Sequence, residues 1–238
     1  DLRERGYDRF KPQELAIIAW SYSVTGAIVG SQVLNHMFVE LAGRDLSFFP
    51  KLSITTVAWA YAHWLQGPNN LVVNLFSQLD ADVTRRGLAE FESHQIAVLL
   101  WAFSKTGQYS AECLVLAQEY LRQADLAEFS PQSLVMCVWS LSIADRATTQ
   151  VFSAIEREML ARGLSEFKAK EINALVFALS KAKYTSSPVW DLIDEEAAER
   201  ATRPSSLESA ESTADYTLDA EYSDTLSESP EQSPGAGE

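Results

Sequence analysis

Polar and basic side chains recur at the two ends of a block of eleven residues that this chain repeats. Near the start of the block stand glutamine, histidine, serine and asparagine, whose side chains donate and accept hydrogen bonds. Just beyond its end stand lysines, which bind phosphate and other anions as positive point charges. We therefore regard these side chains as candidate contacts for a polar or anionic ligand.

The block occurs five times, and each copy opens with Phe and closes with Trp or Phe. The copies are FKPQELAIIAW (residues 10–20), FPKLSITTVAW (49–59), FESHQIAVLLW (91–101), FSPQSLVMCVW (129–139) and FKAKEINALVF (167–177). Their opening residues are 39, 42, 38 and 38 residues apart. A period of this size is typical of stacked helical repeats, whose extended surfaces bind long ligands. We number repeat positions from the residue after the opening Phe, which is position 1.

The aligned copies predict an amphipathic helix in each block. Positions 5, 8 and 12 are apolar in nearly every copy, which is helical spacing for a core face. Position 10 holds Trp20, Trp59, Trp101, Trp139 and Phe177. Such aromatics can stack on nucleic-acid bases, but their register with the apolar positions predicts core residues. Positions 11 and 13 hold only Ser or Ala, which predicts the close approach of a neighbouring helix.

A second amphipathic stretch follows each block. These stretches are residues 31–43, 70–87, 111–124, 148–163 and 188–200. Gly43, Gly87 and Gly163 stand where a helix C-cap is expected. Arg86 and Arg162 directly precede two of these glycines, where a cation has a structural role beside helix carbonyls. The sequence therefore predicts an all-α fold, an α-solenoid of about five helix pairs spanning residues 1–200, with the period of about 38–42 residues set by these blocks.

The charge of the chain is concentrated at its C-terminal end. The net charge is −14, but residues 191–238 hold 14 acidic residues and two arginines, so residues 1–190 are nearly neutral. Residues 201–238 are rich in Ser, Glu, Asp and Pro and poor in aliphatic residues. Because such a segment buries too little apolar surface to offset its ordering entropy, we predict a disordered acidic tail.

The residues that usually carry catalysis or bind metals form no recognisable pattern. His36, His63 and His94 share no repeat position, and no phosphate-binding loop or dinucleotide motif is present. Cys113 and Cys137 lie among apolar neighbours, which predicts buried thiols and no metal site or disulfide. No apolar run is long enough for a transmembrane helix. We therefore expect a binding protein with no cofactor and no enzymatic activity.

The block resembles the octotricopeptide repeat, which is also similar to the helical region of FAST-kinase-like and RAP-domain proteins of organelles. The likeness lies in FKPQEL (residues 10–15), FSPQ (129–132) and WAFSKTG (101–107), and it extends over residues 5 to about 200. The second copy lacks the Pro-Gln pair, and no RAP domain follows the repeats. The resemblance implies single-stranded RNA as ligand, a mitochondrial or chloroplast location, and a role in RNA processing, stability or translation.

Positions that vary between copies are the candidate RNA contacts, because helical repeats that read RNA use two or three side chains per repeat. The candidates at positions 3, 4, 6 and 14 are Gln13, His94, Gln132, Lys170, Ser53, Gln95, Ser133, Asn173, Lys105 and Lys181. The alternative is that they are solvated residues at helix ends. The near-neutral repeat region favours another reading, in which the solenoid is a scaffold for protein partners and binds no nucleic acid.

Overall fold

The computed structural model describes residues 6–25, 28–65 and 70–202, and its α-helices form five consecutive pairs. The first helices of the pairs are α2 (Pro12–Thr25), α4 (Lys51–Trp64), α6 (Ser93–Lys105), α8 (Pro131–Ile143) and α10 (Ala169–Lys181). The second helices are α3 (Ile28–Ala42), α5 (Asn70–Arg86), α7 (Glu112–Gln123), α9 (Thr149–Arg162) and α11 (Val189–Thr202). The predicted all-α repeat fold is confirmed.

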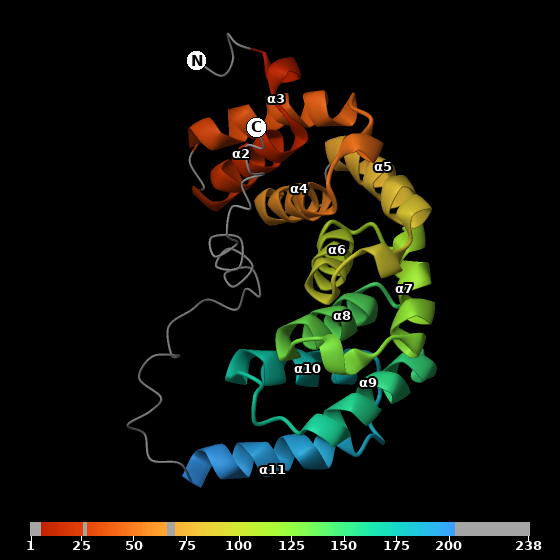
Figure 1. The fold of residues 1–238 in the computed structure, drawn as a ribbon. Helices are drawn as coiled ribbons and strands as arrows, with labels where there is room; N and C mark the ends of the chain where they lie inside the picture. The colour runs from red at the N-terminus through yellow and green to blue at the C-terminus, as the bar shows by residue number, and fades with distance from the viewer. Residues whose placement is uncertain (1–5, 26–27, 66–69, 203–238) are drawn as a thin grey trace, which may run out of the picture. The chain divides into compact units, whose positions relative to one another are not determined.

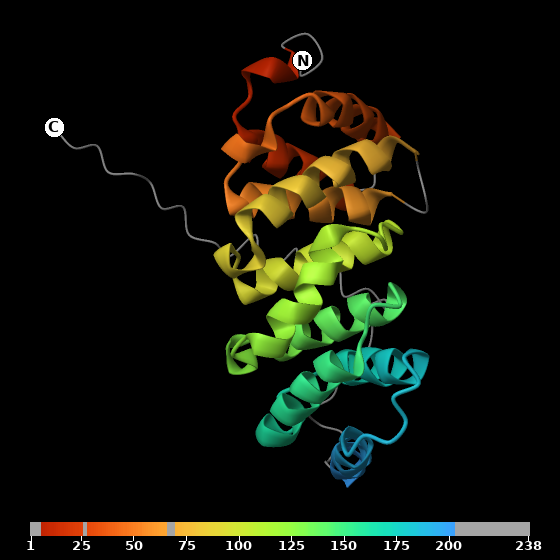
Figure 2. The ribbon, with the colours of Figure 1, turned by 90° about the vertical axis from the view of Figure 1, so that its right-hand side faces the viewer.

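The helices form two layers. The first helices stack one against the next along the repeat axis, and the second helices α5, α7 and α9 run beside them (Figure 1). The view turned by 90° shows α5, α7 and α9 in front of the first helices (Figure 2). This arrangement follows from the repeat, because each pair has too little apolar surface to bury alone and needs its neighbours.

Short 3-10 helices, which the sequence analysis did not predict, open the first four repeats. They are η1 (Tyr7–Arg9), η2 (Leu46–Phe48), η3 (Leu88–Glu90) and η4 (Leu126–Glu128). Each ends at the opening Phe, whose backbone N–H donates to the carbonyl of the first residue of the turn. We call this turn and its Phe the link, and in the fifth repeat the link is residues 164–167. Its buried leucine and Phe anchor the entry to each first helix after η1.

Positions 5, 8 and 12 of each first helix face the second helices. In α4, α6 and α8 these positions are buried, as the apolar pattern predicted. Cys137 occupies position 8 of α8, and its burial raises the pKa of the thiol. Cys113 on α7 is also buried, and both thiols are free, which confirms that they form no disulfide.

The small residues at positions 11 and 13 lie where successive first helices meet. Ala60, Ala102, Ser140 and Ala178 at position 11 are all fully buried. The hydroxyl of Ser104, at position 13, donates to the carbonyl oxygen of Ser140 on the next first helix at 2.9 Å. A larger side chain would push the helices apart, so the predicted close approach is confirmed.

A recurring contact, here called the arginine clasp, joins the end of a second helix to the link of its own repeat. The guanidinium of Arg162 pairs with Glu158, one helical turn earlier, at 2.8 Å. It also donates to the carbonyl oxygens of Phe129 at 2.7 Å and Leu126 at 3.1 Å. The planar guanidinium can satisfy a carboxylate and several carbonyls at once, which an ammonium group cannot do in this geometry.

The clasp occurs in four of the five repeats. Its arginines are Arg44, Arg86, Arg162 and Arg200, and their carboxylate partners are Glu40, Asp82, Glu158 and Glu196. Each arginine reaches the carbonyl of the opening Phe of its repeat. The third repeat has Tyr120 and Ala124 at these two places and has no clasp. The structural role predicted for Arg86 and Arg162 is confirmed.

The positive backbone angle of two glycines supports the chain reversal after the clasp. Gly87 and Gly163 follow clasp arginines and have φ of 83° and 76°. Side chains are disfavoured in this conformation, which explains glycine at the predicted C-caps.

The predicted C-terminal boundary falls close to the end of the described residues. Ala201 and Thr202, assigned to the tail, are the last residues of α11. The predicted disorder of residues 203–238 lies outside the described part of the chain. By contacts, the chain divides into two units, Asp1–Arg203 and Pro204–Glu238.

Trp101→Ala is expected to lower the free energy of unfolding by roughly 3–5 kcal/mol, because a buried aromatic is lost and leaves a cavity. Trp101 is 3% exposed. Phe48→Ala is the control, since Phe48 is 79% exposed and should change stability by less than about 0.5 kcal/mol. Urea unfolding of both variants measures the difference. Equal urea midpoints for Trp101→Ala and Phe48→Ala would contradict the burial of Trp101 in the core.

Arg162→Met is expected to cost roughly 2–3 kcal/mol, because it leaves Glu158 and three link carbonyls without their charged donor. The matched control is Arg122→Met on α7, where the arginine pairs only with the exposed Glu119 in a surface contact. Thermal unfolding compares the two. If both variants had the same melting temperature, the clasp would contribute nothing to the stability of the fold.

Candidate nucleic-acid interface

Positions 3, 10 and 14 of the first helices share one face. At 100° per residue these positions lie within about 40° of one another, roughly opposite positions 5, 8 and 12. Since the second helices cover that opposite side, positions 3, 10 and 14 lie on the open side of the first-helix layer. We call this surface the open face.

Two of the three positions on the open face are accessible in every repeat. Position 3 holds Gln13, Leu52, His94, Gln132 and Lys170, which are exposed or half-buried. Position 14 holds Val24, His63, Lys105, Ile143 and Lys181, which are also exposed or half-buried. The structure therefore brings six predicted contacts onto one surface: Gln13, His94, Gln132 and Lys170 at one end of the helices, and Lys105 and Lys181 at the other.

The aromatic residues of position 10 lie between these two rows and are not uniformly core. Trp59 and Trp101 are buried at 1% and 3% exposure, whereas Trp20 and Trp139 are half-buried and Phe177 is 49% exposed. The expectation of a core column is therefore correct for the middle of the stack and wrong for Phe177. Position 10 lies on the open face, and no described first helix follows α10 in the stack to cover Phe177.

Side chains at position 14 cover two of these rings. The imidazole of His63 stacks on Trp59, with ring centroids 4.7 Å apart and planes 8° from parallel. The ammonium group of Lys105 lies 5.6 Å from the centroid of the Trp101 ring. Because positions 10 and 14 are one helical turn apart, these contacts hold a cation or an imidazole at the surface in a fixed orientation.

His94 is neutral near physiological pH on this surface. Its partial burial lowers the pKa of the imidazole, and the nearby Glu92 carboxylate, 3.4 Å away, opposes this effect. A neutral imidazole offers one hydrogen-bond donor and one acceptor, like the amides of Gln13 and Gln132 in the same row. Position 3 therefore supplies hydrogen-bonding groups in three repeats.

The structure corrects the prediction that the residues at position 4 contact a ligand, because these residues are buried against the preceding repeat. Ser53, Gln95 and Ser133 are 4–6% exposed. Gln95 accepts a hydrogen bond from the backbone N–H of Glu92, and Ser133 bonds to Ser130, so both satisfy the start of their helix. These three side chains belong to helix capping and packing and are left out of the open face.

Asn173 is exposed but lies apart from the open face. It occupies position 6, which points along the stack toward the following repeat, and its equivalents in the other first helices are buried. It is accessible because no described first helix follows α10 in the stack.

The lysines and the arginines of the chain differ in their distribution between the two helix layers, and the sequence analysis did not note this contrast. All seven lysines lie in a first helix or within two residues of one: Lys11, Lys51, Lys105, Lys168, Lys170, Lys181 and Lys183. The basic residues of the second helices are all arginines, and most are paired with acidic residues of the same helix. The signal was available in the sequence, because lysines cluster at block ends and arginines do not.

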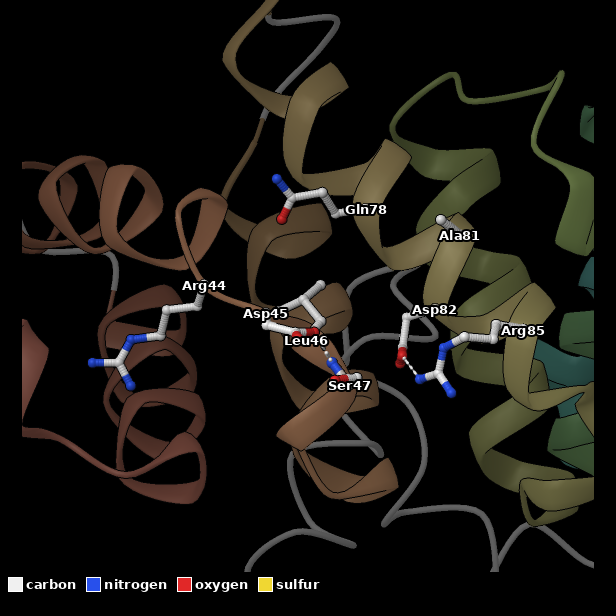
Figure 3. Close-up of a pocket in the computed structure, with 8 residues that line it drawn as sticks. All are labelled: Arg44, Asp45, Leu46, Ser47, Gln78, Ala81, Asp82 and Arg85. Carbon is white, nitrogen blue, oxygen red and sulfur yellow. Dashed lines mark hydrogen bonds and ion pairs between the residues drawn. The ribbon is translucent and has the colours of Figure 1, made fainter.

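Three hollows among the described residues lie along the links. One is lined by Arg44, Asp45, Leu46, Ser47, Gln78, Ala81, Asp82 and Arg85 (Figure 3). The close-up shows Asp45 turned to the backbone N–H of Ser47 and Asp82 turned to Arg85. Hydrogen bonds from Ser47, first from its side chain and then from its backbone N–H, lower the pKa of Asp45. The charged groups of this hollow already have partners within the fold, since Arg44 pairs with Glu40 and Asp82 pairs with Arg85.

The described residues contain no cluster of three or more His, Cys, Asp or Glu side chains that could hold a metal. Within the same part of the chain, no helix combines the length and apolar character needed to cross a bilayer. A comparison with protein-family models finds no match, and a comparison with curated proteins also finds none.

Proposed function

We propose that this chain binds single-stranded RNA along the open face. The observation that carries the proposal is the opposite charge of the two helix layers. The first helices hold four lysines and two glutamates, of which Glu171 is buried. The second helices hold twelve acidic and six basic residues. A polyanion is therefore attracted to the first-helix layer and repelled by the other.

The rows of the open face suit a single strand better than a duplex. Lysines at positions next to the helix ends can contact phosphates, while the amides and imidazole of position 3 can bond to base edges. Flat surfaces for bases that are not paired in a duplex are offered by the half-buried Trp20 and Trp139, by the exposed Phe177 and by the imidazole of His63. Each repeat then contacts one short stretch of the strand.

The biological setting of this binding rests on the resemblance to the octotricopeptide repeat. We propose that the protein acts in a mitochondrion or chloroplast on RNA processing, stability or translation, by binding and without catalysis. Its repeats recognise the transcript by the side chains of position 3, which differ from copy to copy.

A second candidate function is a scaffold for a protein partner. It is favoured by the apolar residues that interrupt both rows, Leu52 at position 3 and Val24 and Ile143 at position 14. A peptide that inserts apolar side chains beside these residues would bind with little dependence on salt, whereas a polyanion would not.

The double variant Lys105→Ala/Lys181→Ala is expected to weaken binding of a random single-stranded RNA pool. It should reduce the slope of log affinity against log salt by about 1.4, since each phosphate contact on a single strand contributes about 0.7. Fluorescence anisotropy at several salt concentrations measures the slope. The matched control is Arg157→Ala, which removes an exposed charge from the second-helix layer and should leave the affinity unchanged.

Two results would contradict this proposal. Absence of binding at low salt would remove RNA as the ligand and favour the protein scaffold. Equal losses in Lys105→Ala/Lys181→Ala and Arg157→Ala would show that RNA responds only to total charge and does not use the open face.

A further inference from the structure

The first helices have two further faces that point along the stack, in opposite directions. Positions 6, 9 and 13 point toward the following repeat, and we call them the following face. Positions 4, 7 and 11 point toward the preceding repeat, and we call them the preceding face. On a helical wheel the two faces lie roughly 160° apart, so one helix can pack against neighbours on both sides.

The following face is buried in every first helix except α10. In α2, α4, α6 and α8 all residues at positions 6, 9 and 13 are buried. In α10 these positions are Asn173 and Ser180, which are exposed, and Val176, which is half-buried. Phe177 at the adjacent position 10 is 49% exposed, whereas its equivalents Trp59 and Trp101 are buried. α10 therefore presents a packing face with no helix on it among the described residues.

The preceding face is bare at the other end of the stack. In α4, α6 and α8, positions 4, 7 and 11 are all buried. In α2 these positions are Glu14, Ile17 and Ser21; Glu14 is exposed, Ile17 is 60% exposed and Ser21 is half-buried. Val24, one turn further on, is also exposed. An isoleucine and a valine in solvent on one helix face indicate a surface that another element can cover.

The contact between α6 and α8 gives the register in which such faces meet. The hydroxyl of Ser104, at position 13, donates to the carbonyl oxygen of Ser140, at position 11 of the next helix. Each residue of a following face therefore meets the residue two positions lower on the next preceding face. If α10 packed on an α2 in this register, the Ser180 hydroxyl would lie at the carbonyl oxygen of Ser21, and Val176 would lie against Ile17.

The polar residues of the two bare faces match in the same register. Asn173 at position 6 would meet Glu14 at position 4. The amide of Asn173 donates hydrogen bonds and the carboxylate of Glu14 accepts them, so the pair can be satisfied when water is excluded. Glu171, the equivalent of Glu14 in α10, is already 2% exposed against the preceding repeat, so a glutamate is compatible with burial at this position.

We propose that a second copy of this chain is the partner of each bare face, with α10 of one copy packed on α2 of the next. The contact continues the stacking that the fold already uses between its own repeats. Because it joins two different surfaces, it continues from copy to copy, as an open chain or as a ring where the rotation between copies closes, and the size of the assembly depends on concentration. The open faces of successive copies would then form one longer surface.

The test measures the mass of the full 238-residue chain by sedimentation velocity across a dilution series. Salt is added to screen the net charge of −14, which opposes association. The expected result for the unchanged chain is a mass that rises with concentration past that of a dimer. Ile17→Glu and Phe177→Glu should each be monomeric. The control is Phe48→Glu, which places the same charge on an exposed Phe away from both faces and should still associate.

An equimolar mixture of Ile17→Glu and Phe177→Glu is the decisive sample. Each variant retains one intact face, so the mixture should form dimers that stop growing. The proposal is overturned if the unchanged chain stays monomeric at every concentration, if either variant still associates alone, or if the mixture stays monomeric. Melting temperatures verify folding, and Ser180→Lys replaces Phe177→Glu if that variant melts early.

Discussion

The fold depends on the close stacking of successive first helices. Each of these helices packs its apolar residues against the second helices and its small residues against the neighbouring first helices. A single helix pair therefore cannot bury its apolar surface alone. Ser and Ala at positions 11 and 13 let the helix axes approach, and Trp59 and Trp101 are enclosed in the space between them. The same constraint leaves only one side of the inner first helices α4, α6 and α8 in contact with solvent, and that side belongs to the open face.

The arginine clasps fix how one repeat follows another. Each clasp joins the end of a second helix to the link of its own repeat, and the next link begins directly afterwards. The distance between consecutive first helices is thereby held by charge-assisted hydrogen bonds as well as by packing. The clasps therefore explain why the second helices carry arginines and the first helices carry lysines. Most arginines of the second helices are bound within the fold, while the lysines remain at the ends of the first helices.

The helix pairs, their boundaries and most of the core were predictable, because apolar residues at helical spacing report burial against a neighbour. The 3-10 turns of the links were not, since each is only three residues long and closes through one local hydrogen bond, which is too short to leave a helical period of apolar residues in the sequence. The open face was found only in part. Gln13, His94 and Gln132 at position 3 and Lys105 at position 14 were identified by their variation, but Ser53, Gln95 and Ser133 vary in the same way for a different reason. All three are buried, and Gln95 and Ser133 form hydrogen bonds at the start of their helices. Polarity alone does not distinguish such a buried group from a surface contact.

The proposed function places the ligand on the first-helix layer, away from the acidic second helices. Photo-crosslinking of single-stranded RNA to the full chain, followed by mass spectrometry of the linked peptides, tests that placement most directly. The account predicts crosslinks at position 3, position 14 and the adjoining aromatic residues, such as His94, Lys105 and Trp139, in several repeats. Crosslinks concentrated on α5, α7 or α9 would contradict it.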